Sequence, residues 1–421
     1  MSVLTATEEY QALPPTRYGW LRWGIGFTIL GFLWIGGMMV VAAVVLPQRL
    51  KDLGLANPAA ILAAVNTFGA VTALVANLVW GNLSDRTRSR FGRRTPWMIG
   101  GALAAGFFLW ATSLATGPAM LILLFVLYQL SLNALLAPAV AVMSDRVPKS
   151  QLATVSAFYG IGITVGVQIG IIIGARFLGN TSVGFILGGV MVAASAILAI
   201  VIWPKEPSTK GLPAPTGGLK EVLLSMRPPG RAPDFWWMFG ARFSILVGYA
   251  MIQGFQLFIL QDYLKLPESE VKSTLATGAT ITLVVSLIGG AIGGPISDLI
   301  KRLKLPVVVS TLMFGAGIAM LWLLPPATTT GYFLWAAIAG LGYGIYQSID
   351  QAILVSVLPD REKAGKDLGI LNASTTAGQA VGPIITGTIV GVTASYSLAF
   401  PVAVFFVALA ALFVMRIKNV P

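Results

Sequence analysis

The chain has 421 residues, of which 56% are hydrophobic and only 10% are charged, and its net charge is +12. This balance excludes a soluble globular domain and is typical of a protein with many membrane-spanning segments. Because the chain contains neither Cys nor His, disulfides, thiol chemistry and His-based catalysis are excluded, and neither an enzymatic activity nor a metal centre is expected.

Apolar runs of about 20 residues recur along the whole chain, and each is sufficient to cross ~30 Å of hydrocarbon as an α-helix. The sequence therefore predicts an all-α integral membrane protein with twelve transmembrane helices. In chain order, these spans are expected near 23–46, 59–82, 97–115, 118–143, 154–178, 183–203, 235–261, 271–296, 306–325, 331–357, 367–391 and 395–415.

The distribution of basic residues predicts the orientation of the spans. If both termini are cytoplasmic, the cytoplasmic loops hold 22 of the 28 Lys and Arg residues, the opposite loops hold five, and Arg242 lies within a span. Because basic loops stay in the cytoplasm, we expect a multi-pass protein of the cell (inner or plasma) membrane with both termini inside. This asymmetry explains the positive net charge, so no nucleic acid partner is expected. The basic loops are expected to be attracted to the anionic headgroups of the lipid bilayer.

The segment 204–234 is the longest between two spans and is rich in Pro and Gly. It is predicted to be a cytoplasmic linker between an N-terminal six-helix bundle at 1–203 and a C-terminal one at 235–421. Three motifs recur in both halves, two of them after 212 or 213 residues, which predicts an internal duplication of the kind found in transporters that rock two bundles around a central site. The matching pairs are Gly81-Asn-Leu-Ser-Asp85 with Gly294-Pro-Ile-Ser-Asp298, Gly166-Val-Gln-Ile-Gly170 with Gly378-Gln-Ala-Val-Gly382, and Ser144-Asp-Arg-Val-Pro148 with Leu358-Pro-Asp-Arg361.

The loop after the second span reads Gly81-Asn-Leu-Ser-Asp-Arg-Thr-Arg-Ser-Arg-Phe-Gly-Arg-Arg-Thr-Pro96. It resembles the signature between helices 2 and 3 of the major facilitator superfamily, Gly-x-Leu-Ala-Asp-Arg-x-Gly-Arg-Arg, and the likeness in span number and duplication covers the whole chain. The resemblance implies the major facilitator fold of two six-helix bundles, with this loop as a latch between the halves. The expected latch residues are Gly81, Asp85, Arg86, Gly92, Arg93 and Arg94.

Physical reasons support such a loop. A glycine at the end of the span allows helices to approach, an aspartate can face the positive N-terminus of a neighbouring helix, and arginines offer planar forks to carboxylates. The alternative is that these arginines only follow the distribution of positive charge toward the cytoplasm.

The loop departs from the general signature because Gly92 lies seven positions after Asp85 rather than three. This longer form, together with Tyr346-Gln-Ser-Ile-Asp350, resembles the sucrose/proton symporters and their relatives in the glycoside–pentoside–hexuronide cation symporter group. The resemblance implies cation-coupled uptake of a sugar or glycoside. Sodium symporters of the melibiose type carry acidic ligands in helices 2 and 4, whereas spans 2 and 4 here offer only amides, which favours protons and leaves sodium open.

Two charged residues lie well inside predicted spans, away from their ends: Asp350 in the run Gly340–Leu358 and Arg242 in the run Phe235–Leu260. A charge at such a position costs roughly 2.5–3.5 kcal/mol on insertion scales and marks a functional site. Each lies about seven residues from the cytoplasmic end of its span, or ~10 Å deep at ~1.5 Å per residue. We expect the two to pair, with Asp350 taking up and releasing a proton and Arg242 modulating it; the alternative is a permanent structural ion pair.

Polar side chains spaced three or four residues apart share one face of a helix. Several spans carry such stripes, and they are spans that the resemblance places around a central cavity. For a single amide, an interhelical hydrogen bond is the alternative, and for the aromatic residues of span 1 it is ordinary packing. The expected cavity residues are Phe27, Trp34, Gln129, Asn133, Gln168, Tyr249, Gln253, Gln256, Tyr343, Tyr346, Gln347, Asn372 and Gln379.

Span 5 carries glycines at every fourth position from Gly162 to Gly174. This spacing leaves one face of the helix without side chains and is expected to permit close contact with a neighbouring helix.

Three functions stay open at this stage. The first is proton-coupled symport of a small sugar- or glycoside-like substrate by alternating access, performed by a monomer that uses a proton gradient and no cofactor. The second is transport, including export, of amphipathic compounds or drugs, which the apolar span 1 favours. The third is a non-transporting sensor or assembly factor of the same fold, against which the charges at Asp350 and Arg242 argue.

Overall fold

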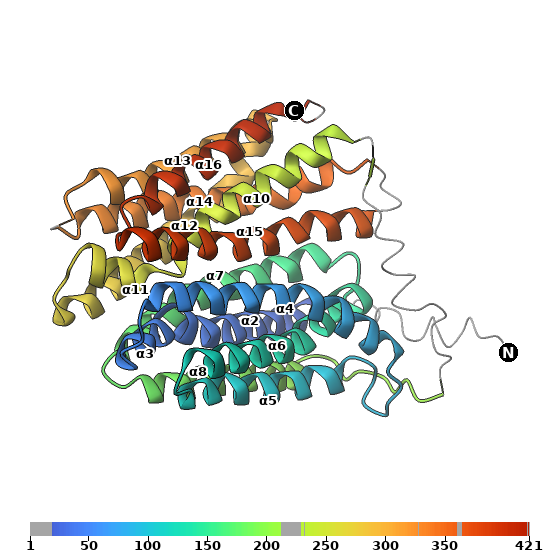
Figure 1. Cartoon of the computed structure of the whole chain (residues 1–421). Helices are drawn as coiled ribbons and strands as arrows, with labels where there is room; N and C mark the ends of the chain where they lie inside the picture. The colour runs from blue at the N-terminus through green and yellow to red at the C-terminus, as the bar shows by residue number, and fades with distance from the viewer. Residues whose placement is uncertain are drawn as a thin grey trace. The chain divides into compact units, whose positions relative to one another are not determined.

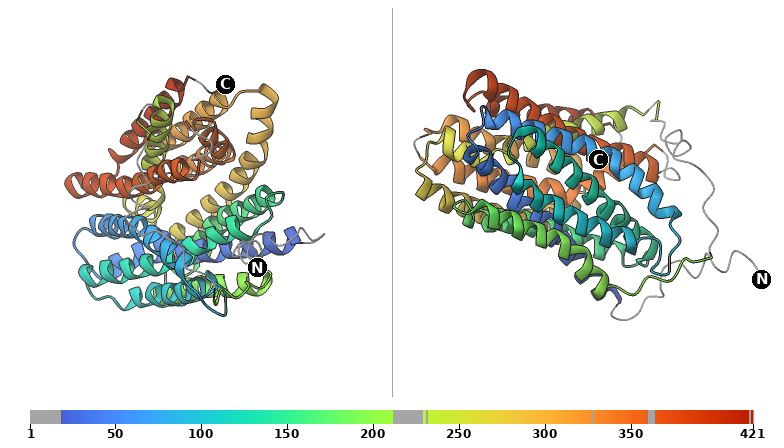
Figure 2. Two further views of the ribbon diagram at one scale, coloured as in Figure 1. Left: turned by 90° about the vertical axis from the view of Figure 1, so that its right-hand side faces the viewer. Right: turned by 60° about the horizontal axis from the view of Figure 1, so that its bottom comes forward.

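The computed structural model describes residues 19–211, 229–230, 232–326, 328–359, 364–418 and 420. The predicted linker 204–234 therefore lies largely outside the described residues, as do residues 1–18 and Arg361. Within the described part, Figures 1 and 2 show helices and no strand, as the sequence predicts.

Within each half of the chain, the described helices follow one another with short connections. In the first half of the chain they are α2 (Gly19–Met39), which continues through the π-helical η1 (Val40–Val45) into α3 (Leu46–Asp52), then α4 (Pro58–Arg86), α5 (Thr95–Ala111) with the short η2 (Thr112–Leu114), α6 (Pro118–Arg146), α7 (Leu152–Arg176) and α8 (Thr181–Ile202). In the second half they are α10 (Pro233–Gln253), α11 (Gln256–Phe258), the π-helical η3 (Ile259–Tyr263), α12 (Glu268–Ile300), α13 (Lys304–Leu323), α14 (Thr330–Ser356), α15 (Ala364–Thr393) and α16 (Ala399–Arg416).

Ten helical segments of the described residues are long and apolar enough to cross a membrane. Two more helices, α14 with 27 residues and α15 with 30, are long enough but less apolar. With these two, a helix lies at each of the twelve predicted spans. The lower hydropathy of α14 and α15 has a simple cause, because these helices carry the polar stripes that include Asp350 and Asn372.

The seventh predicted span, 235–261, is not one continuous helix as expected. Helix α10 ends at Gln253, and the chain resumes helical structure at Gln256. Gly254 lies at the break, and glycine has the lowest helix propensity of any residue except proline. Gln256, one of the expected cavity residues of this span, therefore lies beyond the break and not on α10.

The chain divides into two compact units. Unit 1 holds the described residues of Met1–Val41, Thr72–Gly170 and Asn180–Glu221, and unit 2 holds those of Ala42–Val71, Ile171–Gly179 and Val222–Pro421. In unit 1, α5 packs on α6 and α8, and α8 also packs on α2. In unit 2, α14 packs between α12 and α13, and α10 packs on α15 and α16, which run beside it in Figure 1. The boundaries of the two predicted six-helix bundles stay a prediction.

Glycines bring α7 against α2 as the spacing of span 5 predicts. A Cβ atom on Gly166 would lie 2.7 Å from the carbonyl oxygen of Phe32, and one on Gly170 would lie 2.5 Å from that of Gly36. Such distances leave no room for a side chain, so the two helix backbones touch directly.

The same arrangement occurs between α15 and α10. A Cβ atom on Gly378 would lie 2.7 Å from the carbonyl oxygen of Phe243, and one on Gly382 would lie 2.7 Å from that of Val247. Gly378 and Gly382 are the residues that the sequence pairs with Gly166 and Gly170. The matching motifs thus have the same packing role in both halves, which supports the internal duplication.

Candidate functional site

The central feature of unit 2 is a buried ion pair between α10 and α14. Nη2 of Arg242 lies 3.0 Å from Oδ2 of Asp350, and the side chains are only 10% and 8% exposed. Removing one partner of a buried pair costs about 3–5 kcal/mol, because it leaves an uncompensated charge in an apolar surrounding. The 3.0 Å distance shows that the two residues form the ion pair that the sequence predicts.

Neutral side chains hold the ion pair from two helices. The phenol of Tyr346, one turn before Asp350 on α14, donates a 2.8 Å hydrogen bond to Oδ1 of Asp350. Nη1 of Arg242 donates a 2.8 Å hydrogen bond to Oδ1 of Asn372 on α15. Tyr346 is buried and Asn372 is exposed, so the site reaches the surface of unit 2 at Asn372.

Aromatic rings lie next to the ion pair. The rings of Tyr249 and Tyr343 stack with centroids 4.5 Å apart and planes 15° apart, and Tyr343 is followed by Tyr346 at 6.0 Å. Phe314 of α13 packs 5.6 Å from Tyr343. Stacked rings of this kind give an apolar wall with polar hydroxyl tips. The ion pair and the rings join α10, α13, α14 and α15 in one site.

The remaining predicted cavity residues of unit 2 lie in different surroundings. Gln256 is buried, and its Oε1 accepts a 2.9 Å hydrogen bond from Tyr332. Gln253 is half-buried, and its Nε2 atom is buried without a hydrogen-bond partner among the described residues. Gln347 and Gln379 are exposed.

The predicted cavity residues of unit 1 lie in separate surroundings. Asn133 is buried and donates to the carbonyl oxygen of Gln129 on its own helix at 2.8 Å, and Gln168 is buried on α7. Phe27 is only 1% exposed and packs 4.4 Å from Trp203, so it is a core residue of this unit. Trp34 is half-buried.

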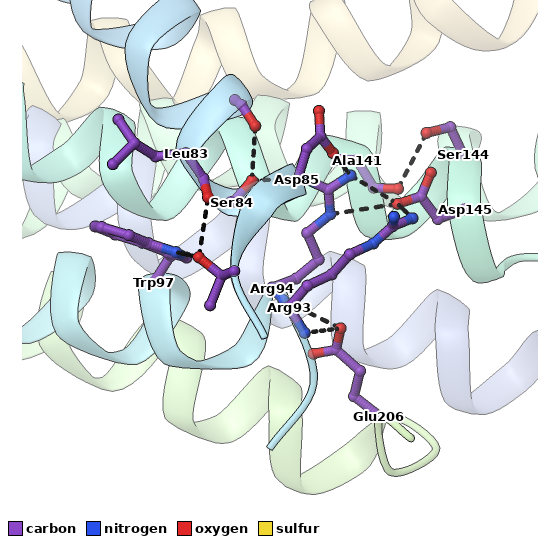
Figure 3. Close-up of polar contacts among 12 residues, drawn as sticks. Leu83, Ser84, Asp85, Arg93, Arg94, Trp97, Ala141, Ser144, Asp145 and Glu206 are labelled. Carbon is purple, nitrogen blue, oxygen red and sulfur yellow. Dashed lines mark hydrogen bonds and ion pairs between the residues drawn. The ribbon is translucent and has the colours of Figure 1, made fainter. Parts of the chain in front are cut away.

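A second polar cluster lies in unit 1, where the predicted latch residues meet α6 (Figure 3). Nη2 of Arg93 and Nη2 of Arg94 each lie 2.8 Å from Oδ2 of Asp145. Arg94, which is almost fully buried, also pairs with Asp85 and donates to Oγ of Ser84. Asp85 thus contacts an arginine rather than the helix N-terminus that the sequence argument gave it.

The acid at the N-terminus of α5 is Glu206. Oε1 of Glu206 accepts backbone N–H bonds from Arg93 (3.0 Å) and Arg94 (3.1 Å), and Oε2 accepts the backbone N–H (2.8 Å) and hydroxyl (2.7 Å) of Thr95. Glu206 is buried and caps the first turn of α5, where a negative charge is favoured. Gly92 adopts φ +88° beside it, and a Cβ atom there would lie 2.1 Å from the Glu206 carboxyl carbon.

Among the residues that the structure describes, the other latch residues have no comparable contacts. Arg86 is exposed. A Cβ atom on Gly81 would meet nothing within 4 Å, so the expectation that this glycine permits a close helix approach was wrong. Asp145 and Glu206, both missed as site residues, carry sequence signals: Asp145 is part of a motif that recurs in both halves, and Glu206 is an acid directly after a span.

A third polar cluster belongs to unit 2 and joins α3 to η3. Lys51 forms an ion pair with Asp262 and lies 5.3 Å from the ring centroid of Phe258. Nε2 of Gln261 donates a 2.9 Å hydrogen bond to Oε1 of Gln48. Within the described residues, no three acidic side chains form a group that could hold a metal ion.

One family model matches most of the chain. A model of the Major Facilitator Superfamily matches residues 26–365 and 274–421. The crystal structure of the nucleoside transporter NupG is similar with a TM-score of 0.71 and 13% identity, over 94% of this chain and 98% of that one. At this identity the likeness shows the fold alone.

A bacterial homolog to the human lysosomal transporter Spinster is also similar. Its inward-facing unoccupied structure has a TM-score of 0.66 and 18% identity, over 94% of this chain and 95% of that one. Its occupied structure has a TM-score of 0.68 and 16% identity, over 97% and 98%.

Among curated proteins, an uncharacterized symporter of Synechocystis sp., sll1374, is 45% identical over 51 residues. This match covers 12% of the present chain and 9% of the relative's length.

Proposed function

Because the chain belongs to the Major Facilitator Superfamily and is thus a multi-pass membrane transporter rather than an enzyme, we propose that it is a proton-coupled symporter of a sugar-like solute. The observation that carries the proposal is the buried pair of Arg242 and Asp350, held by Tyr346 and Asn372. A titratable carboxylate inside a membrane-spanning helix is costly and is retained where it moves protons or binds a substrate.

The proposed cycle uses each group of the site. Asp350 takes up a proton from one side, which weakens its attraction to Arg242, and returns it on the other side, where the ion pair forms again. Alternating access turns this exchange into coupled transport, because the site opens to one side at a time. The Tyr249–Tyr343 stack and the amides of Asn372 and Gln253 offer an apolar face and hydrogen bonds, which suit the two faces of a sugar ring.

The proposal also covers the orientation of the protein in the membrane and its energy source. We propose that both termini are cytoplasmic, because most Lys and Arg residues lie on one side of the expected spans, and that the protein works as a monomer in the cell membrane. Its energy source is the proton gradient, and no cofactor is required. Spans 2 and 4 bring no acid into the membrane, which supports protons rather than sodium.

The alternative of an amphipathic or drug-like substrate rested on the apolar surface of span 1. In the structure, Phe27 of that span is buried against Trp203, so this surface is used in packing. A non-transporting role would not explain why two costly charges, Asp350 and Arg242, lie within membrane-spanning helices.

The proposal is tested with purified protein in vesicles and a pH sensor in the external medium. Addition of glycosides or hexoses is expected to make the medium more alkaline, as protons enter with the solute. Acidification on addition of a cationic drug would support exchange of protons for that drug. Absence of any response to the panel from folded protein, with or without sodium, would contradict a transport role for sugar-like solutes.

A further inference from the structure

Five basic residues of unit 2 gather around the start of α13. The connection between α12 and α13 is only three residues long. Nζ of Lys304, the first residue of α13, donates hydrogen bonds to the carbonyl oxygens of Met415 (3.2 Å) and Ile417 (2.6 Å). These bonds bring the end of α16 beside the connection, and α13 and α16 run side by side in Figure 1. The resulting basic patch consists of Lys301, Arg302, Lys304, Arg416 and Lys418.

The basic patch carries more positive than negative charge. All its members are exposed except Lys304, which is half-buried. Within the described residues, no ion pair includes any of the five. Two acids lie beside them, Asp298 in the last turn of α12 and Asp234, whose Oδ1 accepts the backbone N–H of Lys418 at 3.0 Å. Two carboxylates cannot balance five cations, so the patch attracts anions.

The corresponding loop of unit 1, between α4 and α5, has its positive charges balanced by acids. There Arg94 pairs with Asp145, and Glu206 accepts hydrogen bonds from the backbone of the loop. The loop between α12 and α13 follows the repeated motif 213 residues later, and at this offset the position of Glu206 holds Asn419. Asp360, the counterpart of Asp145, lies outside the described residues. The second loop therefore lacks one of the acids that balance the first.

An apolar surface begins directly beside the basic patch. Leu305, Val309 and Leu312 recur every three or four residues on α13, so they share one face of this helix, and all three are exposed. On α16, Leu412 and Met415 are exposed as well. In a membrane-spanning protein, such side chains contact the acyl chains of lipids, which are as apolar as leucine. Exposed cations thus lie at the end of a surface that fits hydrocarbon chains.

We propose that the basic patch binds an anionic phospholipid, with its phosphate among the cations and its acyl chains along α13 and α16. Phosphate oxygens accept strong, charge-assisted hydrogen bonds from Arg and Lys, and basic sites at the ends of membrane helices attract anionic headgroups. A zwitterionic lipid adds an ammonium group, which the patch repels. A free phosphate ion would not use the apolar surface. This binding site is independent of the solute and of proton coupling.

Lipid binding to the purified full-length protein in detergent tests the proposal. The probes are phosphatidylglycerol and phosphatidylcholine with identical acyl chains, and native mass spectrometry counts the bound molecules over a range of lipid concentrations. We expect the first phosphatidylglycerol to bind at least about tenfold more tightly than phosphatidylcholine, because several cations act on one phosphate. Equal affinities of the wild-type protein for the two lipids would overturn the proposal.

Two triple variants show whether the preference comes from the patch. Lys301→Gln/Arg302→Gln/Lys418→Gln should reduce the preference to about threefold or less. Arg90→Gln/Lys149→Gln/Lys210→Gln removes the same kinds of exposed cation from unit 1 and should keep it. If the first variant does not fold, Arg302→Gln alone should reduce the preference by about half or more. An equal loss in the patch variant and its control would show only general attraction to basic loops and would overturn a site at the patch.

The water-soluble headgroup distinguishes a lipid from free phosphate. Glycerophosphoglycerol has the charge of phosphatidylglycerol but no acyl chains, so at millimolar concentration it should leave the bound lipid in place. Complete displacement of phosphatidylglycerol by this headgroup, or by inorganic phosphate at the same concentration, would show that the acyl chains add nothing and would overturn the lipid as the occupant.

Discussion

At the scale of single residues, the carboxylate of Asp350 is held on both oxygens. Tyr346 donates to Oδ1, while Oδ2 faces Arg242. Tyr346→Phe keeps the ring and removes the donor, so a buried acceptor is left unsatisfied at a cost of about 1–3 kcal/mol. We expect a lower thermal unfolding midpoint in detergent, measured by the intrinsic tryptophan fluorescence of the protein.

The matched control for this change is Tyr263→Phe. The hydroxyl of Tyr263 makes only a 3.3 Å hydrogen bond to the carbonyl oxygen of Leu321, and its loss should shift the midpoint little. Equal midpoints for wild type and Tyr346→Phe would show that this phenol does not stabilise the carboxylate.

Glu206 stabilises the N-terminus of α5 through four hydrogen bonds, which come from the backbone of Arg93 and Arg94 before the helix and from the backbone and hydroxyl of Thr95, its first residue. In Glu206→Gln, an amide NH2 group faces N–H donors in place of a carboxylate oxygen, and the charge that favours a helix N-terminus is lost. Bonds to charged groups are worth about 1.5–3 kcal/mol each, so we expect destabilisation of at least about 2 kcal/mol in chemical unfolding.

Glu268→Gln is the control for this prediction, because Glu268 also lies in the first turn of a helix but is exposed. Its replacement should cost only about 0.3–1 kcal/mol. If the two variants lose the same stability, burial and hydrogen bonding at Glu206 have no special effect.

The sequence could predict some of these residues and not others. Asp350 and Arg242 stand out because a charge in an apolar helix is costly and therefore rare. Asp145 and Glu206 lie beside loops, where charged residues are common, so the repeated motif of Asp145 and the position of Glu206 after a span do not identify their partners before the loop is folded. The spacing of Phe27 and Trp34 on span 1 predicts that they share one face of the helix. It does not predict whether this face lines a cavity or packs in the core.

At the scale of elements, the positions of the helices were predicted well because about 20 apolar residues are needed to cross a bilayer. The irregular parts were not predicted. The π-helical segment η3 lies where distant segments of the chain meet, as in the ion pair of Asp262 with Lys51 of α3. The spacing of hydrophobic residues along the sequence does not predict contacts of this kind.

The close packing of α7 on α2 predicts opposite effects for two similar substitutions. Gly166→Ala puts a methyl group within 2.6–2.7 Å of Ile35 and Phe32, which should destabilise the protein by about 1–3 kcal/mol through overpacking. Gly160→Ala, on the same helix, meets nothing within 4 Å. It should stabilise the helix by up to about 1 kcal/mol, since alanine has the higher helix propensity.

Unfolding measurements on both variants test this account of the glycine stripe. Stabilisation by Gly166→Ala, or a loss of stability in Gly160→Ala as large as that expected for Gly166→Ala, would contradict the packing that the structure describes.

At the scale of the whole molecule, the internal duplication is visible in contacts as well as in motifs. Gln261 donates a hydrogen bond to Gln48, which lies 213 residues earlier in the chain. This separation is that of the matching motifs Gly81–Asp85 and Gly294–Asp298. Residues at matching positions of two repeats can touch only at the symmetry axis that relates the repeats.

Alternating access predicts that this contact opens during transport, because the ends of related helices must separate in turn. The chain has no cysteine, so the double variant Gln48→Cys/Gln261→Cys can be linked by a short bifunctional thiol reagent without a background reaction. We expect linking to slow uptake at least about tenfold, while each single variant keeps its rate after the same treatment. Full transport by the linked protein would contradict a moving contact.

Asp350 is proposed to couple solute movement to protons, and the variant Asp350→Asn tests this role. An asparagine has nearly the same shape but cannot bind and release a proton near neutral pH. In vesicles with a transported solute on both sides, we expect exchange of labelled for unlabelled solute to continue, while accumulation driven by a pH gradient is lost. Accumulation that persists in this variant, at the level of the wild-type protein, would contradict the account.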